Sequence, residues 1–303
     1  MPIRSSHRKQ RSRKQGFTRQ FQRSWNTARP SKRLRIILTI LTATVCAIAL
    51  VISLVRYANW LIEVHEANIN QNQLAQTYDF NPGNIISDGQ FFNSHAMSES
   101  EIQSFLDENG TACTSNECLK TKTFKITAQA KDDICDAIEA GTYTAAQIIS
   151  KSAIACKVSP KVLLTIMQKE QHLVSATAPT QTQYKWAMGL SCPDDAACDT
   201  MYAGFFNQVY GAAKRFHYYL LHEDNYQYHA GTLNYIQYHP NKSCGGTNVY
   251  IENDATALLY IYTPYQPNVA ALKAGVGTGD SCSSYGNRNF SIIYNSWFGN
   301  PRT

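Results

Sequence analysis

The longest apolar stretch of the chain lies close to its first residue. Residues 36–55 are 20 consecutive positions without a charge, and Arg35 and Arg56 bound them. At about 1.5 Å per residue, a helix of this length spans the roughly 30 Å hydrocarbon core of a bilayer. Tyr57 and Trp60 follow where an interfacial aromatic belt belongs. The pattern therefore predicts one transmembrane helix.

A cleaved signal peptide is the alternative interpretation of this stretch. The apolar run is longer than a usual signal-peptide core, and residues 55–60 read Val-Arg-Tyr-Ala-Asn-Trp, without an A-x-A-like cleavage site. We therefore expect an uncleaved membrane anchor.

Later segments carry helix-start signals. Ser98 with Glu101, and Thr144 with Gln147, match the capping box ahead of apolar residues at helical spacing. A long helix also fits residues 201–221. Strand patterns are few and short, so we expect a mainly α, α+β fold. The expected organisation is an arm at 1–35, the anchor at 36–55, a stalk or helical extension at 56–85 and a single disulfide-bonded domain at 86–303.

The charge distribution orients this arrangement. The net charge is +6, but residues 1–35 hold 12 Lys and Arg and no acidic residue. The rest has 28 − 12 = 16 basic against 22 acidic residues, a net charge of −6. A basic flank marks the cytoplasmic side of a membrane helix, so the C-terminal domain is expected to be extracellular. A nucleic acid partner for the arm is the competing interpretation, and the adjoining membrane helix argues against it.

Cysteine usage agrees with export. Cys46 lies within the apolar span, and eight cysteines follow it. An even number in an oxidising compartment suggests four disulfides, although eight cysteines allow 105 pairings. Proximity favours the pairs Cys113 with Cys118, Cys135 with Cys156, Cys192 with Cys198, and Cys244 with Cys282. Since neither a C-x-x-C motif nor a Cys/His cluster is present, we expect no metal and no cofactor.

The segment from Ser159-Pro160 onward carries the most chemical information. Leu163, Ile166, Met167 and Glu170 follow the i, i+3, i+4, i+7 spacing of one helical face. An apolar stripe that ends in a carboxyl group is typical of a general acid, because an apolar environment disfavours the ionised form. The competing interpretation is that this carboxyl turns to solvent or pairs with a neighbouring Lys or His.

A second motif, Ala187-Met188-Gly189-Leu190, lies 17 residues after Glu170. Together the two segments resemble soluble lytic transglycosylases and goose-type lysozymes, with their lysozyme-like fold. Two weaker likenesses to the same family are the helix at 212–221 and the segment Tyr228-His229-Ala230-Gly231. Further segments are similar to secreted actinobacterial haemagglutinin-like proteins. Taken together, the likeness covers roughly residues 153–299. The chain departs from the family pattern at Gln171, at Ser191-Cys192 and at His229.

This resemblance implies that Glu170 is catalytic and that residues near the motifs contact sugar. It also implies a role for Asp194, which falls where goose-type lysozymes place an Asp. The implied substrate contacts are Gln171, Met188 and Gly189, and the tyrosines near the motifs that we expect on sugar faces are Tyr184, Tyr228 and Tyr235.

The expected function is cleavage of peptidoglycan or another cell-surface glycan. Glu170 protonates the glycosidic oxygen. Either Glu170 then activates the sugar's own 6-hydroxyl, or a second carboxylate, Asp194, Asp195 or Asp199, activates water. The alternative is an inactive glycan-binding or adhesin-like surface protein, which the departures from the motifs motivate.

Overall fold

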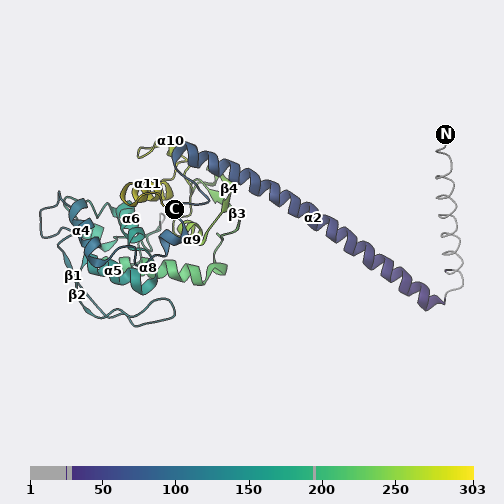
Figure 1. The fold of residues 1–303 in the computed structure, drawn as a ribbon, viewed down its shortest axis with the longest axis horizontal. Helices are drawn as coiled ribbons and strands as arrows, with labels where there is room; N and C mark the ends of the chain where they lie inside the picture. Colours follow the sequence, from purple (N-terminus) through teal and green to yellow (C-terminus); the bar gives the residue numbers. More distant parts are fainter. Residues whose placement is uncertain (1–24, 26–28, 194–195) are drawn as a thin grey trace. The chain divides into compact units, whose positions relative to one another are not determined.

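The chain begins its described structure with one long helix. The computed structural model describes residue 25, residues 29–193 and residues 196–303, and its first labelled element is α2, Pro30–Tyr78 (Figure 1). By length and composition α2 is able to cross a membrane, either as an anchor or as a signal sequence. Three threonine hydroxyls in its apolar part donate to carbonyls four residues earlier. These polar groups are thus satisfied within the helix, as a hydrocarbon environment requires.

The chain divides into two compact units, residues 1–63 and 64–303. The second unit includes the last part of α2. Gln71 is buried there, donating through Nε2 to the Tyr250 carbonyl at 3.1 Å and accepting from the Tyr250 N–H at 2.8 Å. The part of the expected stalk that follows Glu63 therefore belongs to the folded unit.

The second unit is mainly helical, with two small antiparallel sheets. In the first, β1 (Thr123–Ile126) pairs with β2 (Gly141–Thr144). In the second, β3 (Thr232–Gln237) pairs with β4 (Gly246–Ile251). The α-helices are α3 (Asp88–Phe91), α4 (Glu99–Asn109), α5 (Ala145–Cys156), α6 (Pro160–Gln171), α7 (Gln181–Lys185), α8 (Phe205–Leu221), α9 (Asp254–Tyr262), α10 (Val269–Lys273) and α11 (Gly286–Phe298). Short 3₁₀ turns are η1 (Thr200–Tyr202), η2 (Glu223–Asn225) and η3 (Lys242–Cys244).

The predicted capping boxes at the starts of α4 and α5 are confirmed. At the start of α6 the Ser159 hydroxyl makes no capping bond and is buried without a hydrogen-bond partner among the described residues. The fixed φ of Pro160 at the first helical position suits the start of α6 instead. The helix predicted at 201–221 is broken at Gly204, whose φ of +106° separates η1 from α8.

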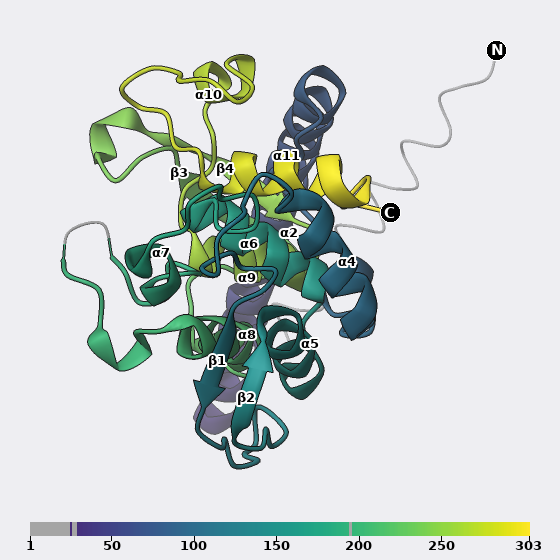
Figure 2. The same ribbon diagram turned by 90° about the vertical axis from the view of Figure 1, so that its left-hand side faces the viewer.

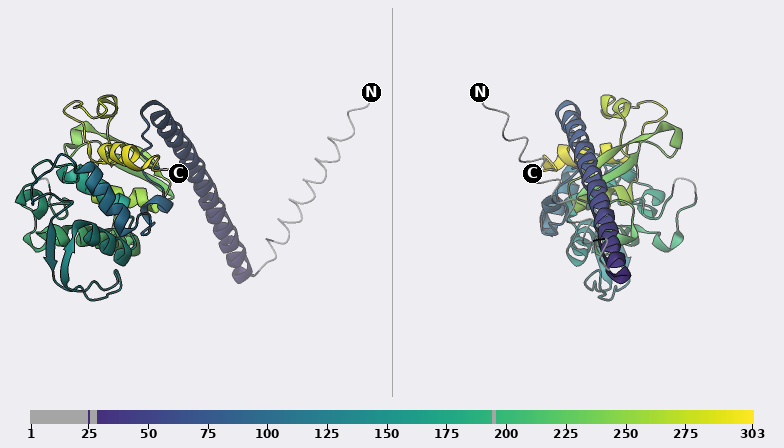
Figure 3. Two further views of the ribbon diagram at one scale, coloured as in Figure 1. Left: turned by 60° about the vertical axis from the view of Figure 1, so that its left-hand side comes forward. Right: turned by 90° about the vertical axis from the view of Figure 1, so that its right-hand side faces the viewer.

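Packing places α6 and α8 at the centre of the unit. The helix α5 packs against α8 and α4, and the β1–β2 hairpin lies beside α5 (Figure 2). The C-terminal helix α11, yellow in Figure 3, packs against α6. The predicted apolar face of α6 is fully buried at Leu163, Ile166 and Met167, so this helix positions whatever follows its last turn.

Four disulfides tie the unit together, in the pairs that sequence proximity favours. They are Cys113–Cys118, Cys135–Cys156, Cys192–Cys198 and Cys244–Cys282. Cys46, in α2, is free. Because disulfides persist in oxidising compartments, their number is typical of an extracytoplasmic domain.

Candidate functional site

Glu170 stands on the last turn of α6, where the buried face of the helix gives way to a partly exposed side chain. Its Oε1 forms an ion pair with Lys169 Nζ at 2.7 Å. The Lys169 side chain is only 7% exposed, against 27% for Glu170, and its ammonium also donates to Thr263 Oγ1 at 3.1 Å. The carboxylate therefore pairs with a nearly buried cation, whereas the sequence pattern predicted an apolar environment. The reason is that Thr263, far away in sequence, draws the adjacent lysine inward.

The turn at Met188, Gly189 and Leu190 is held by a buried glutamine. Gln208 Oε1 accepts from the Met188 and Leu190 N–H groups at 3.1 and 3.0 Å, and its Nε2 donates to the Leu190 and Tyr202 carbonyls at 3.2 and 2.8 Å. Gln208 thus replaces the hydrogen bonds that a sheet or helix would have supplied to this turn.

The Met188 carbonyl accepts a further hydrogen bond at 2.6 Å, from the Tyr262 hydroxyl. Burial raises the pKa of this hydroxyl well above its ordinary value, and the charge of Glu170 acts in the same direction. Tyr262 therefore remains a neutral donor near neutral pH, and it adds a second side-chain anchor to the turn that Gln208 holds.

Gly189 brings this fixed turn against the carboxylate. Its φ is +64°, in the left-handed region that favours glycine. A Cβ added there would lie 2.8 Å from Glu170 Oε2 and 2.9 Å from Glu170 Cδ, closer than real Cβ contacts. The Glu170 carboxylate therefore contacts the Lys169 ammonium and also lies against Gly189, where no residue other than glycine fits.

The Glu170 cleft, with a volume of about 710 Å³, opens over this carboxylate. Five segments line it: the end of α6, the loop at 189–193, the β3–β4 turn at 239–240, the end of α9 with the residues that follow it (262–265), and the turn that leads into α11 (283–286). Its surface combines tyrosine rings with serine and threonine hydroxyls and one histidine, His239. This size and mixture suit a polar ligand with apolar faces.

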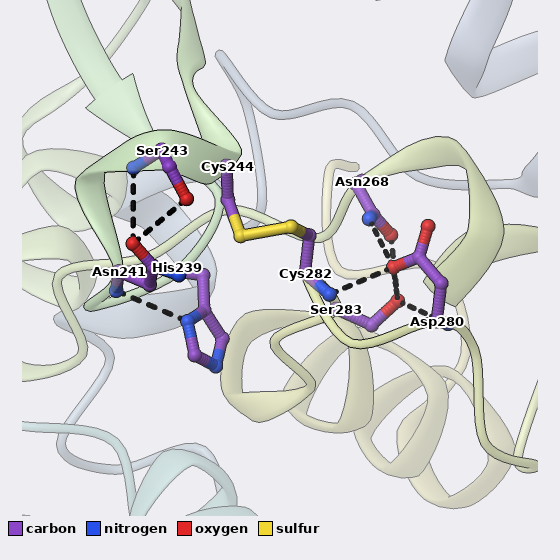
Figure 4. Close-up of a disulfide and its surroundings, with 8 residues drawn as sticks. All are labelled: His239, Asn241, Ser243, Cys244, Asn268, Asp280, Cys282 and Ser283. Carbon is purple, nitrogen blue, oxygen red and sulfur yellow. Dashed lines mark hydrogen bonds between the residues drawn. A yellow bond between two sulfur atoms is a disulfide. The ribbon is translucent and has the colours of Figure 1, made fainter.

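Disulfides secure three of these segments. Cys192 lines the cleft and is joined to Cys198. The Cys244–Cys282 bridge joins the β3–β4 turn to the turn before α11 (Figure 4). Beside that bridge the Asp280 carboxylate accepts from Asn268, Cys282 and Ser283. The hydrogen bonds of Asn268 and Ser283 lower the pKa of Asp280 below its ordinary value, so the turn keeps an ionised acceptor that holds its shape.

Of the residues predicted for the site, Glu170 and Gly189 meet in the cleft. Met188 is fully buried and is not part of the described cleft lining. Tyr184 lies in the core, 3% exposed, packs against Phe205 and donates its hydroxyl to the Glu117 carbonyl. Its ring is therefore not available to a sugar.

The other predicted contacts lie away from the described cleft lining. Tyr228 is buried and donates to the Pro264 carbonyl at 3.3 Å, so it supports the 262–265 segment from behind. Tyr235 is 55% exposed on β3. Gln171 accepts from Gln183 through its backbone carbonyl. Asp194, with its neighbour at position 195, lies outside the described residues.

Sequence reasoning missed Tyr262, Thr263, Tyr265 and Tyr285 as cleft residues. The tyrosine-rich segment at 260–265 was a possible signal, since a helix that ends in several tyrosines and a proline presents aromatic side chains at a turn. Within the described residues no group of three or more His, Cys, Asp or Glu side chains is arranged to hold a metal ion.

Comparison with known proteins corrects the family prediction. No curated protein and no solved structure matches the chain. The family described as "LasA, N-terminal domain" matches residues 84–303. The predicted membership of the lysozyme-like superfamily is therefore wrong. The short motifs behind it describe a proline-started amphipathic helix and a tight glycine turn, local features that recur in unrelated proteins. The match spans most of the chain, which thus belongs to the LasA N-terminal domain family.

Proposed function

We propose that this chain is a membrane-tethered enzyme that cleaves glycosidic bonds of peptidoglycan or another cell-surface glycan, with Glu170 as acid and base. One observation carries the proposal: a carboxylate projects into a cleft of about 710 Å³ while a rigid glycine turn presses on it. Catalytic groups need such fixed positions, because misplacement by about 1 Å costs on the order of 100-fold in rate.

The proposed reaction uses Glu170 twice. The first step requires the protonated form of Glu170 rather than the carboxylate that is ion-paired with Lys169. The proton of this carboxyl group passes to the glycosidic oxygen as the bond from that oxygen to the anomeric carbon breaks. The resulting carboxylate then takes a proton from the hydroxyl that attacks the anomeric carbon, so that Glu170 is restored. The hydroxyl comes either from the sugar's own 6-position or from water. Lys169 acts as a positioning residue, because it holds one carboxylate oxygen.

A second carboxylate would favour attack by water. Asp199 does not supply it, since its side chain is exposed and accepts from the Met201 N–H at 2.9 Å. Among the described cleft residues Glu170 is the only carboxylate. Asp194 and Asp195, outside the described residues, keep both routes open.

A glycan-binding protein without cleavage is the second candidate. The ion pair with Lys169 favours it, because this contact occupies Oε1 and holds the carboxylate apart from a ligand. For either candidate we propose that the basic arm at 1–35 faces the cytoplasm and that the disulfide-bonded unit lies outside.

Incubation of the full-length protein, in detergent, with purified peptidoglycan tests the proposal. We expect products separable by mass: anhydro-muropeptides indicate attack by the 6-hydroxyl, and reducing ends indicate attack by water. Glu170→Gln should lower the rate by roughly 100- to 10,000-fold, the usual contribution of acid and base catalysis.

Glu108→Gln, an exposed change of the same kind on α4, is the matched control and should leave the rate unchanged. If the wild type and Glu170→Gln both bind the wall and leave it intact, the binding-protein candidate replaces the enzyme.

A further inference from the structure

A second cavity, the α8 cavity, lies along α8 and has a volume of about 610 Å³. It shares no described lining residue with the Glu170 cleft. The residues that characterise it are four tyrosines and two cations: Tyr202, Tyr210, Tyr218, Tyr226, Lys214 and Arg215. An exposed methionine, Met201, lies at the same cavity with 73% of its surface accessible. The proposed cleavage at Glu170 does not use this cavity.

The two cations differ in their partners. Lys214 is paired with the Asp132 carboxylate. Arg215 forms no ion pair with a carboxylate in the described part of the chain. Its Nη2 donates to the Tyr202 hydroxyl at 3.0 Å, and its guanidinium lies 5.5 Å from the centre of that ring. Because a guanidinium offers five N–H donors in a planar fork, it retains donors for a carboxylate.

Tyr210 contributes to the cavity wall but not to its binding groups. The residue is only 6% exposed and its hydroxyl is buried. The Lys214 ammonium lies 5.8 Å from the centre of its ring. Lys214 is therefore engaged by both Asp132 and Tyr210, and Arg215 is the cation of this cavity that remains for a ligand.

The tyrosines indicate the remaining chemistry. Each ring has an apolar face and a polar hydroxyl, which matches a sugar ring, with its C–H faces and hydroxyl groups. Tyr218 is 38% exposed, so part of its ring is accessible to a ligand. We propose that the α8 cavity binds a carboxylate-bearing sugar, with Arg215 on the carboxylate and Tyr218 against the ring.

Calorimetric titration of the full-length protein in detergent tests this assignment. The probe is tetragalacturonate, and its fully methyl-esterified form is the matched neutral ligand. We expect the acid form to bind and the ester to bind at least about ten-fold more weakly, because esterification removes a charge-assisted hydrogen bond.

Two variants locate the site. Arg215→Gln should weaken binding of the acid roughly 10- to 100-fold and leave binding of the ester unchanged. Tyr218→Ala, a change at a partly exposed side chain that we expect the fold to tolerate, should weaken both forms. Lys273→Gln, which removes an exposed charge on α10, is the control and should bind as the wild type does. A thermal melt of each variant verifies that it is folded.

Several results would overturn the proposal. These are no binding of tetragalacturonate by the wild type, equal binding of acid and ester, or wild-type affinity in both Arg215→Gln and Tyr218→Ala. Displacement by inorganic phosphate at the same concentration would show a plain anion site and would also reject the sugar. Loss of wall cleavage in Glu170→Gln has no bearing on these outcomes.

Discussion

Replacing Gln208 by Leu should destabilise the folded unit and loosen the turn that presses on Glu170. Gln208 is fully buried, and leucine has a similar size, so the change mainly removes hydrogen bonds. The affected partners are the Met188 and Leu190 N–H groups and the Leu190 and Tyr202 carbonyls.

The magnitude follows from these four contacts. A hydrogen bond contributes about 1 kcal/mol net, and each buried donor left without a partner costs about 1–3 kcal/mol. We therefore expect a loss of about 4 kcal/mol in the free energy of unfolding, a large part of the roughly 5–15 kcal/mol typical of a domain. For a unit of this size that corresponds to a fall in Tm of about 8–16 °C.

Thermal unfolding of the full-length protein in detergent, followed by near-ultraviolet circular dichroism with the disulfides intact, measures this effect. Gln76→Leu, an exposed glutamine near the end of α2, is the matched control and should leave Tm almost unchanged. A fall in Tm below about 2 °C for Gln208→Leu would contradict the reasoning, since it would mean that these backbone groups find other partners at no cost.

Three further predictions concern other parts of the unit. Gly189→Ala places a methyl group 2.8 Å from the Glu170 carboxylate and puts a non-glycine residue at φ +64°. The variant should lose about 1–2 kcal/mol of stability, measured by thermal melting. It should also lose most wall cleavage, measured by product analysis. Replacing both Cys244 and Cys282 by Ala opens a loop with a sequence separation of 38 and should cost up to about 4 kcal/mol in denaturant titration; an unchanged midpoint would contradict this. The hydrogen bond from Lys214, with backbone N–H groups, lowers the pKa of Asp132 from 3.8 to about 2. Its stabilisation is therefore present above about pH 4 and lost as the pH falls toward 2, and Asp132→Asn should flatten the Tm profile there.

Much of the local structure was predictable, because its causes are local. Capping boxes depend on side chains three residues apart, and the apolar run of α2 depends on composition alone. The position of Glu170 at the end of the buried face of α6 follows from the helical repeat of 3.6 residues per turn. The disulfide pairs were predictable for a similar reason, since each joins cysteines that are neighbours along the sequence.

The predicted sugar contacts depended on tertiary packing, which local sequence patterns do not describe. Tyr184 shortly precedes one motif and Tyr228 begins another, yet both are buried. Tyr184 packs against Phe205, and the Tyr228 hydroxyl donates to the Pro264 carbonyl. Proximity in sequence does not determine which face of a tyrosine reaches solvent. The family prediction was wrong for a similar reason, because short motifs indicate a helix and a turn and carry little information about the whole fold.

The sequence by itself determined a membrane-length helix, a basic flank, a cysteine-rich unit and a helix that ends in Glu170. Only the tertiary structure decided what that carboxylate contacts. Lys169 turns inward because Thr263, 94 residues later, accepts its hydrogen bond. Gly189 reaches the carboxylate because Gln208 holds its turn. These contacts join segments distant along the chain, and their geometry depends on how several helices pack, which no periodic pattern within one segment encodes.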